Sequence, residues 1–339
     1  MRRRGSAPGA IQRRKRGTFM AKARKKPKAK TTRKKSAPVV RRAVGPTASP
    51  TEKALNQVSA EIRKLQQKRE QLLSRAIREQ DARARSAVKQ AEKKEQKIWR
   101  ILGEGDSWIR YTCGFGVMHH LAWMLDKRAA CVNIGGSGAT LQRMMKLPAR
   151  RELDNHLRNG IDGKPWDALV FSGGGNDFAG DEFVNWLKPF ADQTDPVDAI
   201  DDVAFTALLD HLASLYRELG ALVNRLSPNT QVFVCAYDFA IPDGRKVPFA
   251  GPWLKPGFDN REYLPANLAF RTAVVKIMLT RFADMIDSVS ATYPFIHLVP
   301  TQGTLSPAVT SWDNELHPTE DGFKAITRVL ITSLEAVLP

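Results

Sequence analysis

Short apolar runs alternate with longer helical patterns throughout residues 97–339, and this alternation constrains the fold more than any other feature of the chain. The first run begins the stretch at residues 99–108, and the others are residues 129–133, 167–171, 231–236 and 295–299. The helical pattern is clearest at residues 202–226, where apolar residues recur at spacings of three and four. Strands that alternate with helices pair in parallel, so we predict an α/β domain with about five parallel strands and helices on both faces.

The first apolar run ends in the tripeptide Gly105-Asp106-Ser107. An apolar run closed by glycine predicts a buried strand that ends in a tight turn. Ser107 would then lie at the carboxyl end of the sheet, where open α/β sheets bind their ligands. Gly, Asp and Ser are also ordinary turn residues, so this tripeptide alone does not define a site.

Three further stretches follow in order: residues 133–140 (Asn-Ile-Gly-Gly-Ser-Gly-Ala-Thr), residues 173–177 (Gly-Gly-Gly-Asn-Asp) and residues 313–318 (Asp-Asn-Glu-Leu-His-Pro). Each follows an expected strand or lies in an expected loop. Together with the Gly-Asp-Ser turn, the four blocks resemble those of the SGNH/GDSL family of serine hydrolases, over about residues 97–339. The resemblance implies a three-layer, flavodoxin-like hydrolase domain that cleaves a carboxylic ester through an acyl-enzyme.

The resemblance also implies a role for each block. Acyl transfer needs a nucleophile, a base, an orienter for the base, and hydrogen-bond donors for the developing oxyanion. Ser107 would be the nucleophile and His317 the base, while the amides of Ser107 and Gly138 and the side chain of Asn176 would form the oxyanion hole. We expect neither a metal ion nor an organic cofactor. The ester substrate stays open, and a thioesterase or a polysaccharide deacetylase would use the same machinery.

The residue that orients His317 departs from the Asp-x-x-His pattern of the family. Asn314 lies three residues before His317, and Asp313 precedes it. A carboxylate would fix the ring tautomer and stabilise the imidazolium, whereas an amide carbonyl accepts the ring N–H without supplying charge. We favour the carbonyl of Asn314, or a backbone carbonyl, as orienter, with Asp313 outside hydrogen-bond range. The alternative is a one-residue shift that lets Asp313 reach the ring.

Positive charge is concentrated at the N-terminus. Residues 1–50 contain 18 lysines and arginines and no acidic residue, whereas residues 101–339 carry a net charge of −7. The segment has almost no aliphatic or aromatic side chains, so it cannot bury enough apolar surface to offset its ordering entropy. We predict a disordered basic arm at residues 1–50. It would bind nucleic acid or another polyanion through its charges, or act only as a solubilising tail.

Residues 51–96 predict one long helix, because they contain no glycine or proline and are rich in strong helix formers. Apolar residues recur at spacings of three and four, interrupted by Arg69, at Leu55, Val58, Ile62, Leu65, Leu72 and Ala76. Such a stripe covers roughly three heptads, the short limit for a coiled coil. The helix therefore either mediates homo-oligomerisation, or lies on the catalytic domain or in solvent.

The N-terminus lacks the apolar segment of a secretory signal peptide, and no apolar run is long enough to span a membrane. We therefore expect a cytoplasmic protein, although an arginine-rich leader is also typical of organelle transit peptides. The three cysteines show neither metal-site nor disulfide spacing. The alternative to an esterase is a catalytically inactive hydrolase-like domain within a scaffold protein that binds a polyanion through the arm and helix.

Overall fold

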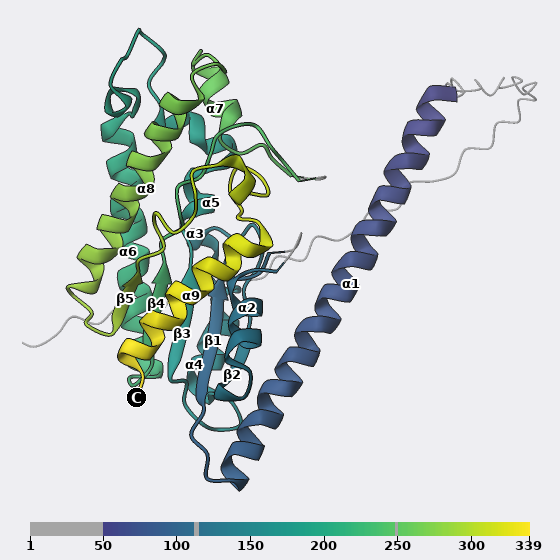
Figure 1. Cartoon of the computed structure of the whole chain (residues 1–339), viewed down its shortest axis with the longest axis vertical. Helices are drawn as coiled ribbons and strands as arrows, with labels where there is room; N and C mark the ends of the chain where they lie inside the picture. Colours follow the sequence, from purple (N-terminus) through teal and green to yellow (C-terminus); the bar gives the residue numbers. More distant parts are fainter. Residues whose placement is uncertain (1–49, 112–114, 248–249) are drawn as a thin grey trace, which may run out of the picture. The chain divides into compact units, whose positions relative to one another are not determined.

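The computed structural model describes residues 50–111, 115–247 and 250–339 (Figure 1). Within them lies one sheet of five parallel strands in the order β2-β1-β3-β4-β5. The predicted α/β fold with about five parallel strands is therefore confirmed, and the strand order is that of flavodoxin-like sheets. The strands are β1 (Trp99–Gly105), β2 (Ala129–Asn133), β3 (Ala168–Ser172), β4 (Gln231–Cys235) and β5 (Ile296–Val299).

Helices cover both faces of this sheet. The α-helices are α1 (Pro50–Lys93), α2 (Val117–Leu125), α3 (Leu141–Met144), α4 (Arg150–Asn159), α5 (Gly175–Phe178), α6 (Asp202–Leu226), α7 (Lys255–Asn260), α8 (Leu268–Ser290) and α9 (Glu320–Val337). Short 3-10 helices are η1 (Asp126–Arg128), η2 (Gly180–Trp186), η3 (Pro196–Ala199) and η4 (Val309–Ser311). Helices α2 and α9 pack against each other on one face, and α4, α6 and α8 form the layer on the other.

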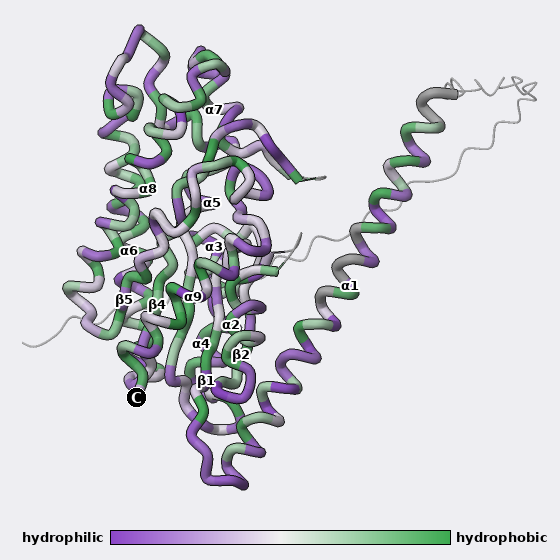
Figure 2. Tube along the Cα trace, viewed as in Figure 1, coloured by the Kyte–Doolittle hydropathy of each residue, from purple (hydrophilic) through white to green (hydrophobic). Residues whose placement is uncertain are grey.

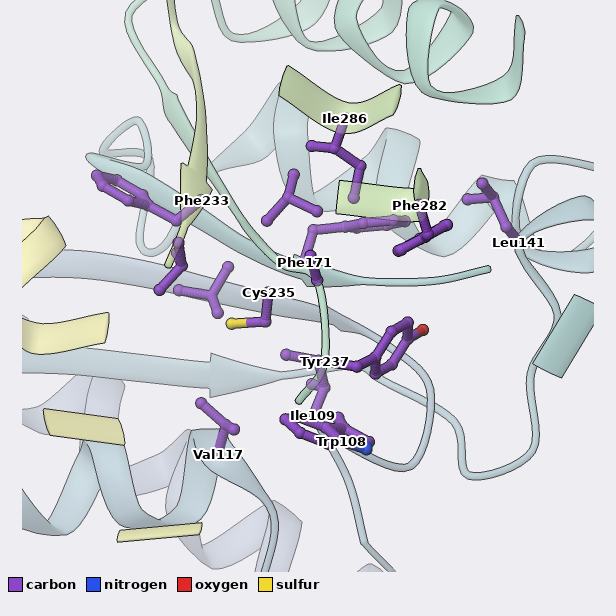
Figure 3. Packing of buried hydrophobic residues seen from close by; sticks show 14 of the residues in the cluster. Trp108, Ile109, Val117, Leu141, Phe171, Phe233, Cys235, Tyr237, Phe282 and Ile286 are labelled. Atoms are coloured by element: carbon purple, nitrogen blue, oxygen red, sulfur yellow. The ribbon is translucent and has the colours of Figure 1, made fainter. Parts of the chain in front are cut away.

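The strands are mainly apolar, as expected for a parallel sheet with both faces covered by helices. Every residue of β2 and β3 is buried, and Figure 2 shows the sheet strands as mainly hydrophobic. Aromatic rings fill the space between the sheet and the α6–α8 layer. Phe171 of β3 meets Tyr216 of α6 edge to face, and Phe282 of α8 lies against Tyr237 at the end of β4 (Figure 3). This core fixes the strand ends that carry the polar blocks.

Two connections between strands contain short helices. The first holds the single turn α3. A separate helix, α4, follows it. The connection at residues 241–263 contains the short helix α7, whose first turn holds Pro256, a position where the missing N–H costs nothing.

Helix α1 spans Pro50–Lys93, close to the predicted range of residues 51–96. In Figure 2 hydrophilic and hydrophobic segments alternate along it. Its last turns belong to the domain, since Ala84, Val88 and Ala91 are buried and Arg85 pairs with Asp162 at 3.3 Å. Earlier in the helix, Leu65 and Leu72 are exposed. Homo-oligomerisation through this stripe stays a prediction.

The basic arm predicted at residues 1–50 lies, except for Pro50, outside the described residues. Among the helices that are described, none combines the length and apolar character needed to cross a membrane.

Candidate active site

Ser107 lies in the tight turn that follows β1, at the carboxyl edge of the sheet. The strand can end this way because Gly105 has a φ of +149°, and a Cβ there would lie 2.3 Å from the Ser172 carbonyl oxygen. The buried Asp106 then closes the turn by accepting the Trp108 amide at 3.0 Å. Ser107 itself is 8% exposed. The turn therefore presents its hydroxyl from a rigid, almost fully covered position.

The structure brings Ser107 together with His317, although 210 residues separate them in sequence. Ser107 Oγ lies 2.7 Å from His317 Nε2, and His317 Nδ1 lies 2.9 Å from Asn314 Oδ1. His317 precedes α9, so its loop is held between the last strand and the last helix. A hydroxyl bonded to an imidazole, whose other nitrogen is bonded to a fixed acceptor, is the arrangement that activates a serine nucleophile.

The amide orientation of Asn314 follows from its neighbours. Its Oδ1 accepts the backbone amides of Leu316 at 3.0 Å and His317 at 3.1 Å, so this atom must be the oxygen. Its Nδ2 faces Tyr111 Oη at 2.9 Å and Asp313 Oδ2 at 3.3 Å. Because Oδ1 can only accept, His317 Nδ1 must carry the ring hydrogen. Nε2 is then free to accept a proton from Ser107.

The carboxylate of Asp313 is bonded to groups other than the imidazole. Its Oδ2 accepts the hydroxyl of Tyr111 at 2.7 Å and the amide nitrogen of Asn314. The ring of Tyr111 stacks on that of His317, with centroids 4.3 Å apart and planes inclined by 17°. Asp313 thus contacts the base through Asn314 and Tyr111, and its charge acts on the imidazole from outside hydrogen-bond range. Within the described part of the chain, the hydrogen-bond partner of His317 Nδ1 is the neutral amide of Asn314.

Burial determines the basicity of His317. The residue is 5% exposed, and desolvation lowers the pKa of its imidazole to about 4, although the nearby Asp313 carboxylate opposes the shift. His317 is therefore neutral at physiological pH, the form that a general base requires.

Each of the three expected oxyanion donors has an N–H group for which the described residues show no acceptor. Within the described residues, neither the Ser107 amide nor that of the exposed Gly138 meets an acceptor, although the amides of Trp108 and Ala139 are paired. Gly138 has a φ of +75°, a conformation that favours glycine. Asn176 uses one hydrogen of Nδ2 to bond the Ala139 carbonyl at 3.0 Å, which leaves the second. This bond also ties the block at residues 173–177 to the one at residues 133–140.

Sequence reasoning missed two buried residues that hold the nucleophile turn. Tyr237 follows β4 with a φ of +64°, and its hydroxyl donates to Asp106 Oδ2 at 2.5 Å and accepts the Gly175 amide at 2.9 Å. Ser172 Oγ donates to Asp106 Oδ1 at 2.6 Å. Ser172 and Tyr237 each stand directly after a predicted strand, and that position was the available signal. These contacts join the Ser107 turn to the block that carries Asn176.

Glu315 is a third residue whose role the sequence did not reveal. It is fully buried, and its carboxylate accepts four backbone amides, from Gly244 at 2.9 Å, Trp253 at 2.5 Å, Leu254 at 2.8 Å and Lys255 at 2.9 Å. The two ends of the connection at residues 244–255 are thereby fastened to the residue two positions before His317. Long connections often serve as lids or binding loops, and this one is held in part by the Glu315 side chain.

A small cavity opens beside the Ser107 hydroxyl. Its volume is about 30 Å³, and its lining includes Ser107, Asn176 and His317. Apolar residues from α5, α8 and the connection at residues 244–255 also line it, among them Phe178, Leu254, Val275 and Leu279. The cavity thus faces the candidate nucleophile, base and oxyanion donor together.

No protein-family model matches this chain, and no curated protein matches its sequence. Solved structures with a similar fold include the lipase Lip_vut3 from a goat rumen metagenome (12% identity, TM-score 0.46, 70% of this chain and 97% of that one). Others are an extracellular lipase from Streptomyces rimosus (14%, 0.44, 69% and 99%) and a GDSL-like lipase from Parabacteroides merdae (17%, 0.41, 70% and 96%). At these identities the similarity concerns the fold at most.

Proposed function

We propose that this chain is a serine hydrolase of the SGNH/GDSL kind that cleaves a carboxylic ester through an acyl-enzyme. The observation that carries the proposal is the bonded series Ser107 Oγ, His317 Nε2, His317 Nδ1 and Asn314 Oδ1, with separations of 2.7 and 2.9 Å. The four sequence blocks, which follow in the family's order along a chain that folds into one parallel sheet, support the same assignment.

In the first half-reaction Ser107 Oγ attacks the ester carbonyl carbon, and its proton passes to His317 Nε2. The carbonyl oxygen becomes an oxyanion, stabilised by the amides of Ser107 and Gly138 and by Asn176 Nδ2. Losing one such donor typically costs ~10²–10³ in rate. The tetrahedral intermediate then collapses, the C–O bond to the alcohol breaks, and His317 returns the proton to the departing oxygen.

In the second half-reaction water attacks the acyl-enzyme while His317 Nε2 accepts one of its protons. The new intermediate expels Ser107 Oγ, which regains that proton, and the carboxylic acid leaves. Throughout both halves the Asn314 carbonyl holds the hydrogen on Nδ1, so Nε2 is the nitrogen that exchanges protons. Neither buried thiol competes as nucleophile, because burial raises the pKa of Cys131 and of Cys235 to about 12.

The proposal is tested by incubating the full-length protein with p-nitrophenyl esters and, separately, with a fluorophosphonate probe. We expect release of p-nitrophenol and covalent labelling of one site, with the labelled peptide containing Ser107. The Ser107→Ala variant supplies the background. Equal labelling of wild type and variant, with no ester turnover by either, would overturn the proposal and favour the inactive scaffold that binds a polyanion.

We also propose that residues 1–50 bind a polyanion, on the basis of their 18 positive and no negative side chains. Binding to duplex DNA should weaken steeply with salt, with log K falling by ~0.9 per phosphate contact per decade of salt concentration. Removal of residues 1–50 should abolish this binding and leave ester turnover unchanged. Fluorescence anisotropy at several salt concentrations measures the slope, and undetectable or salt-independent binding would identify the segment as a solubilising tail.

A further inference from the structure

The cavity beside Ser107 offers very few polar groups to a ligand. Asp238 lines it, but its carboxylate already accepts the amides of Phe239, Gly303 and Leu305, each at 2.7 Å. Asp106 also lines it and is occupied by the three donors described above. The polar groups left for a ligand are therefore those of the reaction itself.

The cavity is also small. A void needs about 10–15 Å³ to hold one water molecule, so a volume of about 30 Å³ holds two or three groups of that size. Val275 and Leu279 are among its lining residues, and they lie one turn apart on α8 and so share one face of the helix. Both are buried, with 0% and 3% exposed, and are held by the packing of α8. Such side chains move aside only at the cost of repacking the core.

The geometry of the tetrahedral intermediate decides which part of the ester enters this cavity. Its central carbon carries Ser107 Oγ, the oxyanion, the leaving oxygen and the acyl chain. Ser107 Oγ belongs to the enzyme, the oxyanion faces the hydrogen-bond donors, and the leaving oxygen faces His317. The fourth substituent is the hydrocarbon, and the apolar wall formed by Phe178, Leu254, Val275 and Leu279 is the surface that suits it.

We infer that this cavity is the acyl-binding site and that it selects acyl groups of two or three carbons. The inference rests on the proposed esterase function and names its substrate class as short-chain esters such as acetyl or propionyl esters. A longer acyl chain exceeds the volume of about 30 Å³.

The experiment compares kcat/KM for p-nitrophenyl acetate, propionate, butyrate and octanoate. One unaccommodated methylene typically costs ~10–200-fold in kcat/KM, so we expect acetate and propionate to be favoured over octanoate by at least ~10-fold. The Ser107→Ala variant corrects for spontaneous hydrolysis. Equal or greater kcat/KM for octanoate would overturn the inference while leaving the esterase proposal intact, whereas failure of every ester together with failure of labelling would remove both.

A matched pair of valines tests the role of the wall. Val274 and Val275 are adjacent on α8 and both fully buried, but only Val275 lines the cavity. Val275→Ala should raise the ratio of butyrate to acetate kcat/KM by at least ~10-fold, because it removes two methyl groups from the wall. Val274→Ala makes a similar void elsewhere and should leave the ratio unchanged. An equal shift in both variants, or in neither, would show that the wall does not set chain length.

Discussion

Replacing Ser107 or His317 by alanine should lower kcat for a p-nitrophenyl ester by between ~10² and ~10⁶, and the double variant should lose no more than either single one. Groups that act as a unit are strongly non-additive, and in the serine-protease case removal of serine or histidine costs ~10⁶, against ~10⁴ for the aspartate. The present site has an asparagine where that aspartate would be, so the smallest expected loss is the ratio of those two values, ~10².

The controls for this prediction are Ser227→Ala and His297→Ala, which remove a buried serine bonded to Thr230 and a half-buried histidine bonded to Gln231. Both lie away from the Ser107 turn, and neither should change kcat by more than a few-fold. Steady-state assays of the four single variants and the double variant decide the matter. If the losses in Ser107→Ala and His317→Ala multiplied in the double variant, the two side chains would not work as one unit.

Exchanging Asp313 and Asn314 should raise kcat and move the pH profile. In serine proteases an asparagine in place of the orienting aspartate lowers kcat by ~10⁴, so a carboxylate at residue 314 should recover up to that factor. The single variant Asn314→Asp would place its new carboxylate beside the carboxylate of Asp313. The double variant Asp313→Asn/Asn314→Asp avoids this repulsion, because the amide nitrogen of the new asparagine can donate to it.

The direction of the pH effect follows from His317, which must be neutral to accept a proton. Because its pKa is about 4, kcat/KM of the wild type should be at its maximum at neutral pH and should decrease as pH falls through about 4. A carboxylate 2.9 Å from Nδ1 favours the imidazolium and raises this pKa, so the acid limb of the double variant should lie at higher pH. An unmoved limb, or a lower kcat, would contradict the assignment of Asn314 as orienter.

Asp313→Ala separates the two arrangements that the sequence left open. With Asn314 as orienter, the substitution should cost less than ~10-fold in kcat, because it removes only a partner of Tyr111 and of the Asn314 amide. A loss of a thousandfold or more would make Asp313 the third member of the triad. Circular dichroism of each variant checks that the fold is retained.

The blocks that carry Ser107 and His317 were recognisable because their order and their positions after strands are local properties of the sequence. The sheet was predictable for the same reason, since each strand is a distinct apolar run. The contacts of Tyr111, Tyr237 and Glu315 were not, because each joins elements that are distant in sequence. Tyr237 and Asp106 are separated by 131 residues and Tyr111 and Asp313 by 202. Local patterns carry no information on such pairings.

The residue that orients His317 shows most clearly what local sequence patterns cannot predict. Asp313 and Asn314 are adjacent, and in a loop either side chain can point toward the ring. The choice depends on two backbone amides, those of Leu316 and His317, which converge on Asn314 Oδ1 once the loop is folded. Loop conformation of this kind is set by packing against α9 and the nucleophile turn, where the Leu316 carbonyl accepts Trp108 Nε1 at 3.0 Å.

The four hydrogen bonds from backbone amides to the Glu315 carboxylate affect which substitutions could change the substrate range. They fasten Leu254 to the same loop that carries His317, so we expect a substitution that displaces the connection at residues 244–255 to displace His317 as well. Among the described residues, no hydrogen bond joins Val275 or Leu279 of α8 to that loop. If the cavity is the acyl-binding site, we therefore expect substitutions on α8 to change the acyl preference with a smaller loss of rate than substitutions in the connection.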